Sequence, residues 1–138
     1  MKSFRIAVKS FIVNKKNELL IIKRRSNDIQ KPNAWEIPGG RLEPGENPYS
    51  GIKRETKEEI GLDIKVLYPL NIKHFIRNDK QTITMIIFIC KAIKSQIILS
   101  EEHQDYEWVH INEAKEKIGE FFHKDVDTYK KLELHKLF

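Results

Sequence analysis

Three glutamates in residues 48–60 have the side chains and the spacing to bind a divalent metal ion. Glu55, Glu58 and Glu59 stand at positions i, i+3 and i+4, which on an α-helix fall within about a third of the circumference. At neutral pH their charges repel one another unless water or cations screen them. Hard ions such as Mg²⁺ prefer oxygen ligands. The spacing therefore predicts a metal site on one side of a short helix.

The flanking residues predict where that helix begins and ends. Asn47 can cap free backbone N–H groups, and Pro48 suits the first helical position. Gly61 supplies a stop at the other end. The apolar stripe that would anchor the helix, beside the acidic sector, consists of Ile52, Thr56 and Ile60.

A glycine-containing segment precedes the helix. Residues 35–38 are predicted to form a short strand that runs into a turn at Gly39 and Gly40, where glycine lets the backbone approach a ligand or metal closely. A charged run on a helix usually means only a solvated face. A surface helix needs neither these glycines nor the isolated Glu46, so the combination favours a functional site.

Residues 40–62 resemble the signature of the Nudix hydrolases. That signature is a glycine, five residues, a glutamate, seven residues, Arg-Glu, an aliphatic residue, any residue, Glu-Glu, any residue, a glycine and an aliphatic residue. Eight of the nine specified positions match in register, and Thr56 stands where a bulky aliphatic residue is usual. The matching residues are Gly40, Glu46, Arg54, Glu55, Glu58, Glu59, Gly61 and Leu62. The resemblance implies one Nudix hydrolase domain over residues 1–138, an α/β (α+β) fold built as an α/β/α sandwich with a mixed β-sheet.

The carboxylates are the expected metal ligands. Hydrolysis of a phosphoanhydride needs an activated water, an electrophilic phosphorus and a neutralised leaving group, and Mg²⁺ held by carboxylates supplies all three. Glu55, Glu58 and Glu59 are the predicted ligands, and the carbonyl oxygen of Gly39 or Gly40 is a further one. Mn²⁺ is a second metal that would suit these ligands.

Two further residues are predicted to act beside the metal ligands. The resemblance implies that Arg54 orients the cluster through an ion pair with Glu46. In the family, the base that activates water is a glutamate of the signature helix or a carboxylate on a later loop. Glu55 is the first candidate for the base, and Glu102 in the loop 100–103 is the second. For Glu102, an exposed loop residue without a catalytic role is an equally good interpretation.

Basic residues at the end of the second predicted strand are candidate phosphate ligands. Lys23, Arg24 and Arg25 are consecutive, and neighbours on a strand face opposite ways, so at most two share a face. Arg24 and Arg25 could hold phosphate oxygens through charge-assisted bonds. A solvated strand edge is the slightly favoured alternative.

The expected activity is Mg²⁺-dependent hydrolysis of a nucleoside diphosphate linked to another group. Within the family, the chain resembles the MutT-like nucleoside triphosphatases more than the specialised branches. This resemblance implies that the products are a nucleoside monophosphate and pyrophosphate. Hydrolysis of ADP-ribose or a related nucleotide sugar is the alternative, as is a non-catalytic module that binds a nucleotide or RNA. No histidine pair has the spacing of a zinc site.

Composition narrows the partners and the compartment. The 25 basic and 20 acidic residues leave a net charge of +5, which favours polyanionic ligands such as nucleotides, whereas no recognised RNA motif supports a nucleic-acid partner. The lone Cys90 cannot form an internal disulfide and is expected in the core. We expect a cytoplasmic protein, because no secretory signal or membrane span is apparent. The family resemblance makes a homodimer plausible.

The remaining pattern predicts a sheet-rich domain with helical cover. Two hairpins are expected, each with a polar turn, and the C-terminal residues from Asn112 onward are predicted to be helical in two pieces. The expected strands are 4–13 paired with 18–23, the short strand 35–38, 62–75 paired with 82–92, and 107–111.

Overall fold

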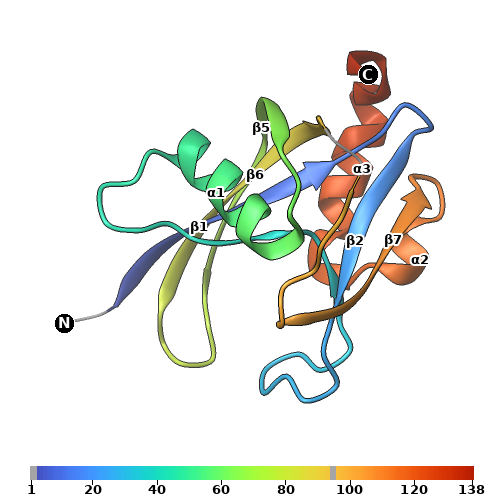
Figure 1. Ribbon diagram of the computed structural model, residues 1–138. Helices are drawn as coiled ribbons and strands as arrows, with labels where there is room; N and C mark the ends of the chain where they lie inside the picture. Colours follow the sequence, from blue (N-terminus) through green and yellow to red (C-terminus); the bar gives the residue numbers. More distant parts are fainter. Residues whose placement is uncertain (1–2, 94–95) are drawn as a thin grey trace.

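The computed structural model describes residues 3–93 and 96–138. Figure 1 shows its helices and strands, coloured along the sequence. They are β1 (Phe4–Ile12), β2 (Glu18–Arg24), β3 (Trp35–Glu36), β4 (Gly39–Arg41), α1 (Pro48–Ile60), β5 (Ile64–Ile76), β6 (Thr82–Ala92), β7 (His103–His110), α2 (Ala114–Lys117), the 3-10 helix η1 (Glu120–Phe122), α3 (His123–Lys131) and the 3-10 helix η2 (Leu134–Leu137).

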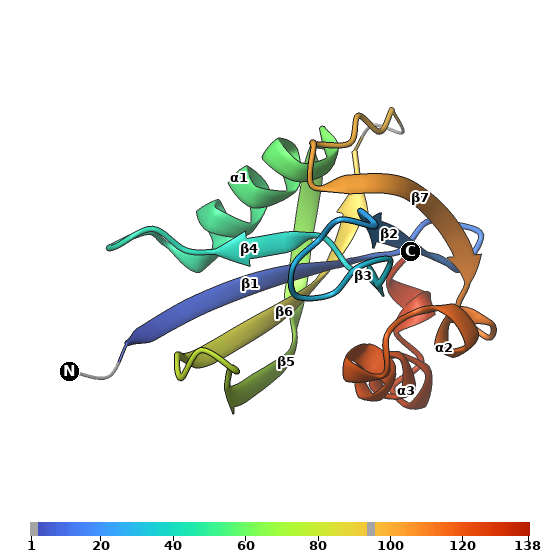
Figure 2. The same cartoon turned by 90° about the horizontal axis from the view of Figure 1, so that it is seen from below.

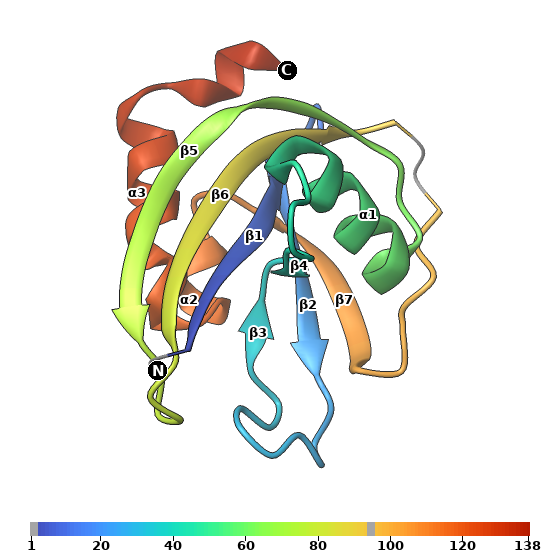
Figure 3. The ribbon, with the colours of Figure 1, turned by 90° about the vertical axis from the view of Figure 1, so that its left-hand side faces the viewer.

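The strands form two sheets, of which the larger is mixed. Its order is β4-β1-β6-β5, with β1 parallel to β6 and the other pairs antiparallel. The smaller sheet, in the order β3-β2-β7, is antiparallel. Figure 3 shows the two sheets meeting near β4 and β2. The predicted α+β class with a mixed sheet is confirmed.

The predicted hairpin of the first two strands is wrong, because β1 and β2 belong to different sheets. Their adjoining ends are linked by an isolated antiparallel bridge between Val13 and Leu19. Both strands are buried on both faces over most of their length. A strand buried on both faces carries little alternation, so the sequence contains no signal for which sheet it enters. The chain crosses between the sheets at residues 14–17, where the side chain of Asn14 accepts hydrogen bonds from the backbone of Lys16 and Glu18.

The second predicted hairpin, β5 with β6, is confirmed. Pro69 lies within β5, and the pairing register shifts on both sides of it. Because β5 is the edge strand of its sheet, the missing N–H of proline can face outward. This hairpin forms one wall of the cleft described below.

The larger sheet has a hydrophobic cluster on each face. Figure 2 shows α1 on one side of the sheet and α2 and α3 on the other. Alternate residues of β1 point to opposite clusters, with Phe11 toward α3 and Ile12 toward α1. Cys90 is fully buried in the cluster beneath α1, as expected, and burial raises the pKa of its thiol. Among the described residues, no helix has the length and apolar character needed to cross a membrane.

Helix α1 begins and ends as predicted. The side chain of Asn47 accepts a hydrogen bond from the backbone N–H of Tyr49 at 2.8 Å. Gly61 ends the helix in the left-handed conformation with φ of 73°. The predicted stripe of Ile52, Thr56 and Ile60 is fully buried.

Three local predictions need correction. Gly39 and Gly40 do not form a turn, since they belong to strand β4, which pairs with β1. Strand β7 begins at His103, because it pairs with β2 well before residue 107. The C-terminal helical region starts at Ala114 and is interrupted at Ile118, whose extended conformation breaks the helix before η1 and α3.

Candidate active site

The three glutamates of α1 stand at different depths. The side chain of Glu58 is 61% exposed, that of Glu55 is 16% exposed and that of Glu59 is 7% exposed. Glu55 and Glu59 line a cleft of about 860 Å³. All three line a smaller groove on its flank, together with the loop 100–102. The structure therefore brings the predicted ligands together at one end of a cleft.

Arg54 ties the acidic cluster to the loop before the helix. Its guanidinium donates two hydrogen bonds to Glu46, at 2.7 and 2.8 Å, which is the ion pair predicted from the sequence. The same group donates to Glu55 and to Glu58, each at 3.0 Å. The hydrogen bonds from Arg54 lower the pKa of Glu46 to about 2. Arg54 thus holds two of the predicted metal ligands, although it is not itself among the residues that line the cleft.

Because Gly40 has no side chain, the carboxylate of Glu55 can occupy the adjacent space. A Cβ atom at Gly40 would lie 2.4 Å from Oε2 of Glu55. At the neighbouring Gly39, where φ is 147°, a Cβ atom would lie 2.0 Å from the carbonyl oxygen of Val8. Both glycines line the cleft, so the close approach expected of them is present although they lie in a strand.

A buried carboxylate, Glu36, joins four strands beneath the acidic cluster. It accepts hydrogen bonds from Lys9 at 3.2 Å, from Arg24 at 3.0 Å and from His103 at 2.9 Å. These residues come from β1, β2, β3 and β7. Burial alone would raise the pKa of Glu36, but the nearby Lys9, His103 and Arg24 outweigh it and lower the pKa to about 2. Glu36 is therefore ionised at neutral pH.

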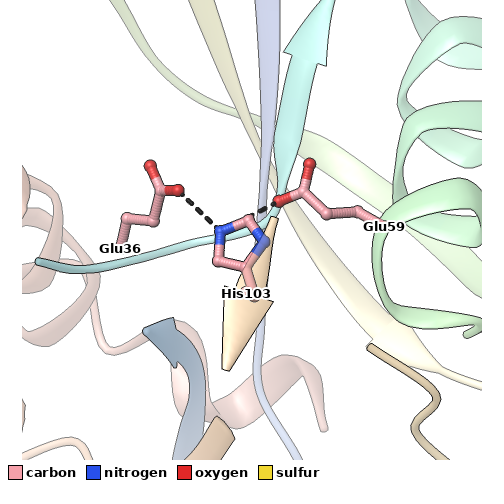
Figure 4. A group of neighbouring side chains, drawn as sticks. All are labelled: Glu36, Glu59 and His103. Atoms are coloured by element: carbon pink, nitrogen blue, oxygen red, sulfur yellow. Dashed lines mark hydrogen bonds and ion pairs between the residues drawn. The ribbon is translucent and has the colours of Figure 1, made fainter. Parts of the chain in front are cut away.

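Glu59 lies next to this network. Figure 4 shows its carboxylate facing the ring of His103, with Glu36 on the other side of the ring. Oε1 of Glu59 is 3.7 Å from Nε2 of His103 and has no hydrogen-bond partner among the described residues. Burial raises the pKa of Glu59 to about 7, against the opposing influence of Lys9 and His103. Burial likewise raises the pKa of Glu55.

The acid cluster fits a divalent metal ion. A buried carboxylate oxygen without a partner is costly, and a cation offers one. Carboxylates and a backbone carbonyl are hard oxygen donors of the kind that Mg²⁺ prefers. Glu55, Glu58, Glu59 and the carbonyl of Gly39 are the residues that would hold such an ion. Glu36, Glu59 and His103 also form a tight group, with one donor atom from each within 4.8 Å of the others.

The predicted phosphate ligands separate in the structure. Arg24 lines the cleft, but it already pairs with Glu36 and, at 3.3 Å, with Asp28. Arg25 is not among the cleft-lining residues and instead donates to the backbone carbonyl of Glu101. The strand-edge alternative thus describes Arg25 better. Glu102 lines both the cleft and the groove.

Sequence reasoning missed Lys9, Glu36 and His103. Lys9 interrupts the apolar run of the first strand, and Glu36 precedes the glycines within a short apolar strand. Charged residues at such positions are rarely buried unless they are paired, which is a usable signal for a buried network. Nothing near His103 in the sequence distinguishes it from the other four histidines.

The lining of the cleft also includes apolar and aromatic side chains. Phe75 and Phe121 meet edge to face with ring centroids 5.3 Å apart. Ile83, Met85 and Phe122 also line the cleft, and the turn after β5 contributes polar residues to its lining. The cleft therefore joins a carboxylate-rich end to a surface on which a flat ring could stack.

Comparison with known proteins agrees with this fold. The family model for the NUDIX domain matches residues 3–130. The chain belongs to the NUDIX family of hydrolases.

Individual relatives narrow the similarity. The nucleoside triphosphatase NudI of Enterobacter sp. (strain 638) is 31% identical over 108 residues, which cover 71% of this chain and 77% of that protein. A MutT-like protein of Streptomyces ambofaciens is 29% identical, covering 85% of this chain and 71% of the relative. Nudix hydrolase 5 of Arabidopsis thaliana is 32% identical over 64% of this chain, a match that spans only 30% of that longer protein.

A solved structure shows the same fold. The MutT protein from Methanosarcina mazei Go1 superposes with a TM-score of 0.83 at 25% identity, covering 96% of both chains.

Proposed function

We propose that this protein is a Mg²⁺-dependent hydrolase that converts a nucleoside triphosphate into a nucleoside monophosphate and pyrophosphate. The observation that carries the proposal is the cleft itself, which is lined by the partly buried Glu55, the buried Glu59 and the aromatic pair Phe75 and Phe121. A triphosphate at the acidic end leaves the base at the aromatic end. The similarity to the NudI triphosphatases supports this substrate class.

The metal would be held by Glu55, Glu58, Glu59 and the carbonyl of Gly39. When bound, Mg²⁺ polarises the phosphoryl group, lowers the pKa of water and neutralises charge on the leaving phosphate. Arg54 holds Glu55 and Glu58 in place through its hydrogen bonds. Mn²⁺ would satisfy the same donors.

In the proposed reaction, the oxygen of water attacks the α-phosphorus and the bond to the bridging oxygen of the β-phosphate breaks. Pyrophosphate leaves with the electron pair of that bond, and a carboxylate takes the proton of the water. Glu55 is our first candidate for this base; it lines the cleft, and burial raises the pKa of its carboxyl. Glu102, which also lines the cleft, is the second.

The test is turnover of a substrate panel with Mg²⁺ or Mn²⁺ in ¹⁸O-labelled water. The panel holds nucleoside triphosphates, ADP-ribose, nucleotide sugars and dinucleoside polyphosphates, and every product is resolved. We expect triphosphate cleavage with ¹⁸O in the monophosphate. Glu58→Gln should reduce turnover, whereas Glu116→Gln, an exposed control on α2, should not.

Other outcomes would overturn the proposal. Cleavage of ADP-ribose or a nucleotide sugar in preference to triphosphates would replace the substrate. ¹⁸O in pyrophosphate would move the attack to the β-phosphorus. A folded wild type that binds nucleotide but turns over none of the panel would indicate a binding module.

A further inference from the structure

We infer that Lys73 and Asp125 are positioning residues for the aromatic wall of the cleft, which consists of Phe75, Phe121 and Phe122. They attach η1 to β5 and so hold the ring of Phe121 where a nucleobase stacks on it. The inference deepens the proposed function and rests on it. It assigns a role to a buried ion pair that does not belong to the acidic cluster.

The first observation is that this charged pair is buried between β5 and α3, which Figure 3 shows beside each other. Asp125, in the first turn of α3, is fully buried, and the side chain of Lys73 is 14% exposed. Nζ of Lys73 lies 2.8 Å from Oδ2 of Asp125. The side-chain amide of Asn71 donates to Oδ1 at 2.9 Å. One carboxylate of α3 therefore contacts two residues of β5.

The second observation is that Lys73 also contacts the wall itself. Its Nζ donates to the backbone carbonyl oxygen of Phe121. The same Nζ lies 4.0 Å from the ring centroid of Phe121 and 5.1 Å from that of Phe122. A cation over an aromatic ring is attracted to it, and more strongly where water is excluded. One ammonium group thus binds both the backbone and the rings of η1, while Asp125 binds the ammonium group.

The third observation is that η1 depends on such contacts for its position. The helix has three residues and no side-chain cap, and a 3-10 turn of this length gains little from its own hydrogen bonds. The ring of Phe121 is 39% exposed, so it is available to a ligand. A ring that is already ordered loses less conformational freedom when a ligand binds to it.

The fourth step concerns why an ion pair occupies this place. A buried ion pair adds little net stability compared with an apolar pair of similar size. Its contacts are directional, however, because Lys73 must lie between a carboxylate and one particular carbonyl oxygen. Phe75, from the same strand, meets the ring of Phe121 edge to face with centroids 5.3 Å apart. The pair is therefore suited to fixing the orientation of the wall more than to stabilising the fold.

The first test observes Phe121 without substrate, by ¹⁹F nuclear magnetic resonance of protein labelled with fluorophenylalanine. The Phe121 signal is assigned by its loss in Phe121→Leu. Lys73→Met keeps a long side chain but removes the charge, and we expect it to shift or broaden the Phe121 signal. Lys65→Met, which replaces an exposed lysine of the same strand, is the matched control and should leave that signal unchanged.

The second test asks whether Lys73 acts through Phe121, by a double-mutant cycle. The readout is the affinity for nucleoside monophosphates without metal, measured by titration calorimetry. Stacking of a base on an aromatic side chain is worth about 5–150-fold in affinity. We expect Phe121→Ala to weaken binding about tenfold and Lys73→Met about fivefold, with Lys73→Arg close to the wild type. In the Phe121→Ala background, Lys73→Met should have no further effect, whereas a merely structural role would weaken binding equally in both backgrounds.

Steady-state kinetics provide a further check. Lys73→Met should raise the KM of the nucleotide by the same factor and leave kcat nearly unchanged, because it removes binding that the ground state and the transition state share. The Mg²⁺ concentration for half-maximal rate should not move. If Lys73→Met does not fold, Lys73→Met/Asp125→Leu replaces it, because an apolar pair leaves no buried charge without a partner.

Three results would overturn the inference. The first is an unchanged Phe121 signal in a folded Lys73 variant. The second is equal weakening of nucleotide binding by Lys73→Met with and without the Phe121 ring. The third is a nucleotide titration of the wild type that leaves the Phe121 signal unmoved. Because these measurements need neither metal nor turnover, failure to hydrolyse the substrate panel would refute the proposed function without deciding them.

Discussion

Replacing Glu36 by glutamine should change how the stability of the protein depends on pH. The carboxyl has a pKa of about 2 in the folded protein, against an ordinary value of 4.5. A carboxyl with a lowered folded pKa stabilises the fold above its unfolded pKa, and that stability is lost as the pH falls through the folded pKa. At about 1.36 kcal/mol for each unit, the shift corresponds to about 3 kcal/mol.

The glutamine variant has two expected effects. Near neutral pH it should be less stable than the wild type by about 3–5 kcal/mol, because Lys9 stays buried after losing its charged partner. Between the ordinary pKa of 4.5 and about pH 2 the wild type should lose the contribution of Glu36, whereas the amide cannot titrate. The gap between the two proteins should therefore narrow by about 3 kcal/mol.

Urea unfolding at a series of pH values, followed by circular dichroism, measures both effects. Glu116→Gln, which removes an exposed carboxylate, is the control and should follow the wild type at every pH. If the curves of wild type and Glu36→Gln ran parallel from neutral to acid pH, Glu36 would not be the ionised centre of the network.

Further predictions concern the helix and the strand beside it. Gly40→Ala should leave the melting temperature nearly unchanged but lower kcat at least about tenfold, because the new Cβ meets only the flexible end of Glu55; an unchanged kcat would show that Glu55 can act from another position. The raised pKa of Glu59, about 7 against 4.5, means that stability falls as the pH rises between those values. Glu59→Gln should therefore be more stable than the wild type above neutral pH without metal, by up to about 3 kcal/mol, as measured by denaturation. The same variant should bind Mn²⁺ more weakly, as measured by electron paramagnetic resonance. Arg54→Lys should lower kcat/KM because a lysine cannot reproduce the paired hydrogen bonds to Glu46; steady-state kinetics that match the wild type would contradict this.

Local features of the sequence were enough to predict α1 and its acidic face. Asn47 and Gly61 determine the ends of the helix through contacts within a few residues, and the helical repeat places the glutamates together. The same locality explains why the hairpin of β5 and β6 was predicted correctly. Most of the candidate metal ligands could therefore be predicted without a structure.

The partition of strands between sheets and the buried network were decided by the tertiary structure. Lys9 and His103 are 27 and 67 residues from Glu36 in the chain. No local sequence pattern indicates which distant strand will lie beside a given strand. Lys9, Glu36 and His103 became one site only when β1, β3 and β7 converged beneath α1. The sequence by itself determined which residues could bind a metal, because helix geometry is local. The tertiary structure decided which buried charges lie beside them, because burial and charge pairing depend on contacts between distant parts of the chain.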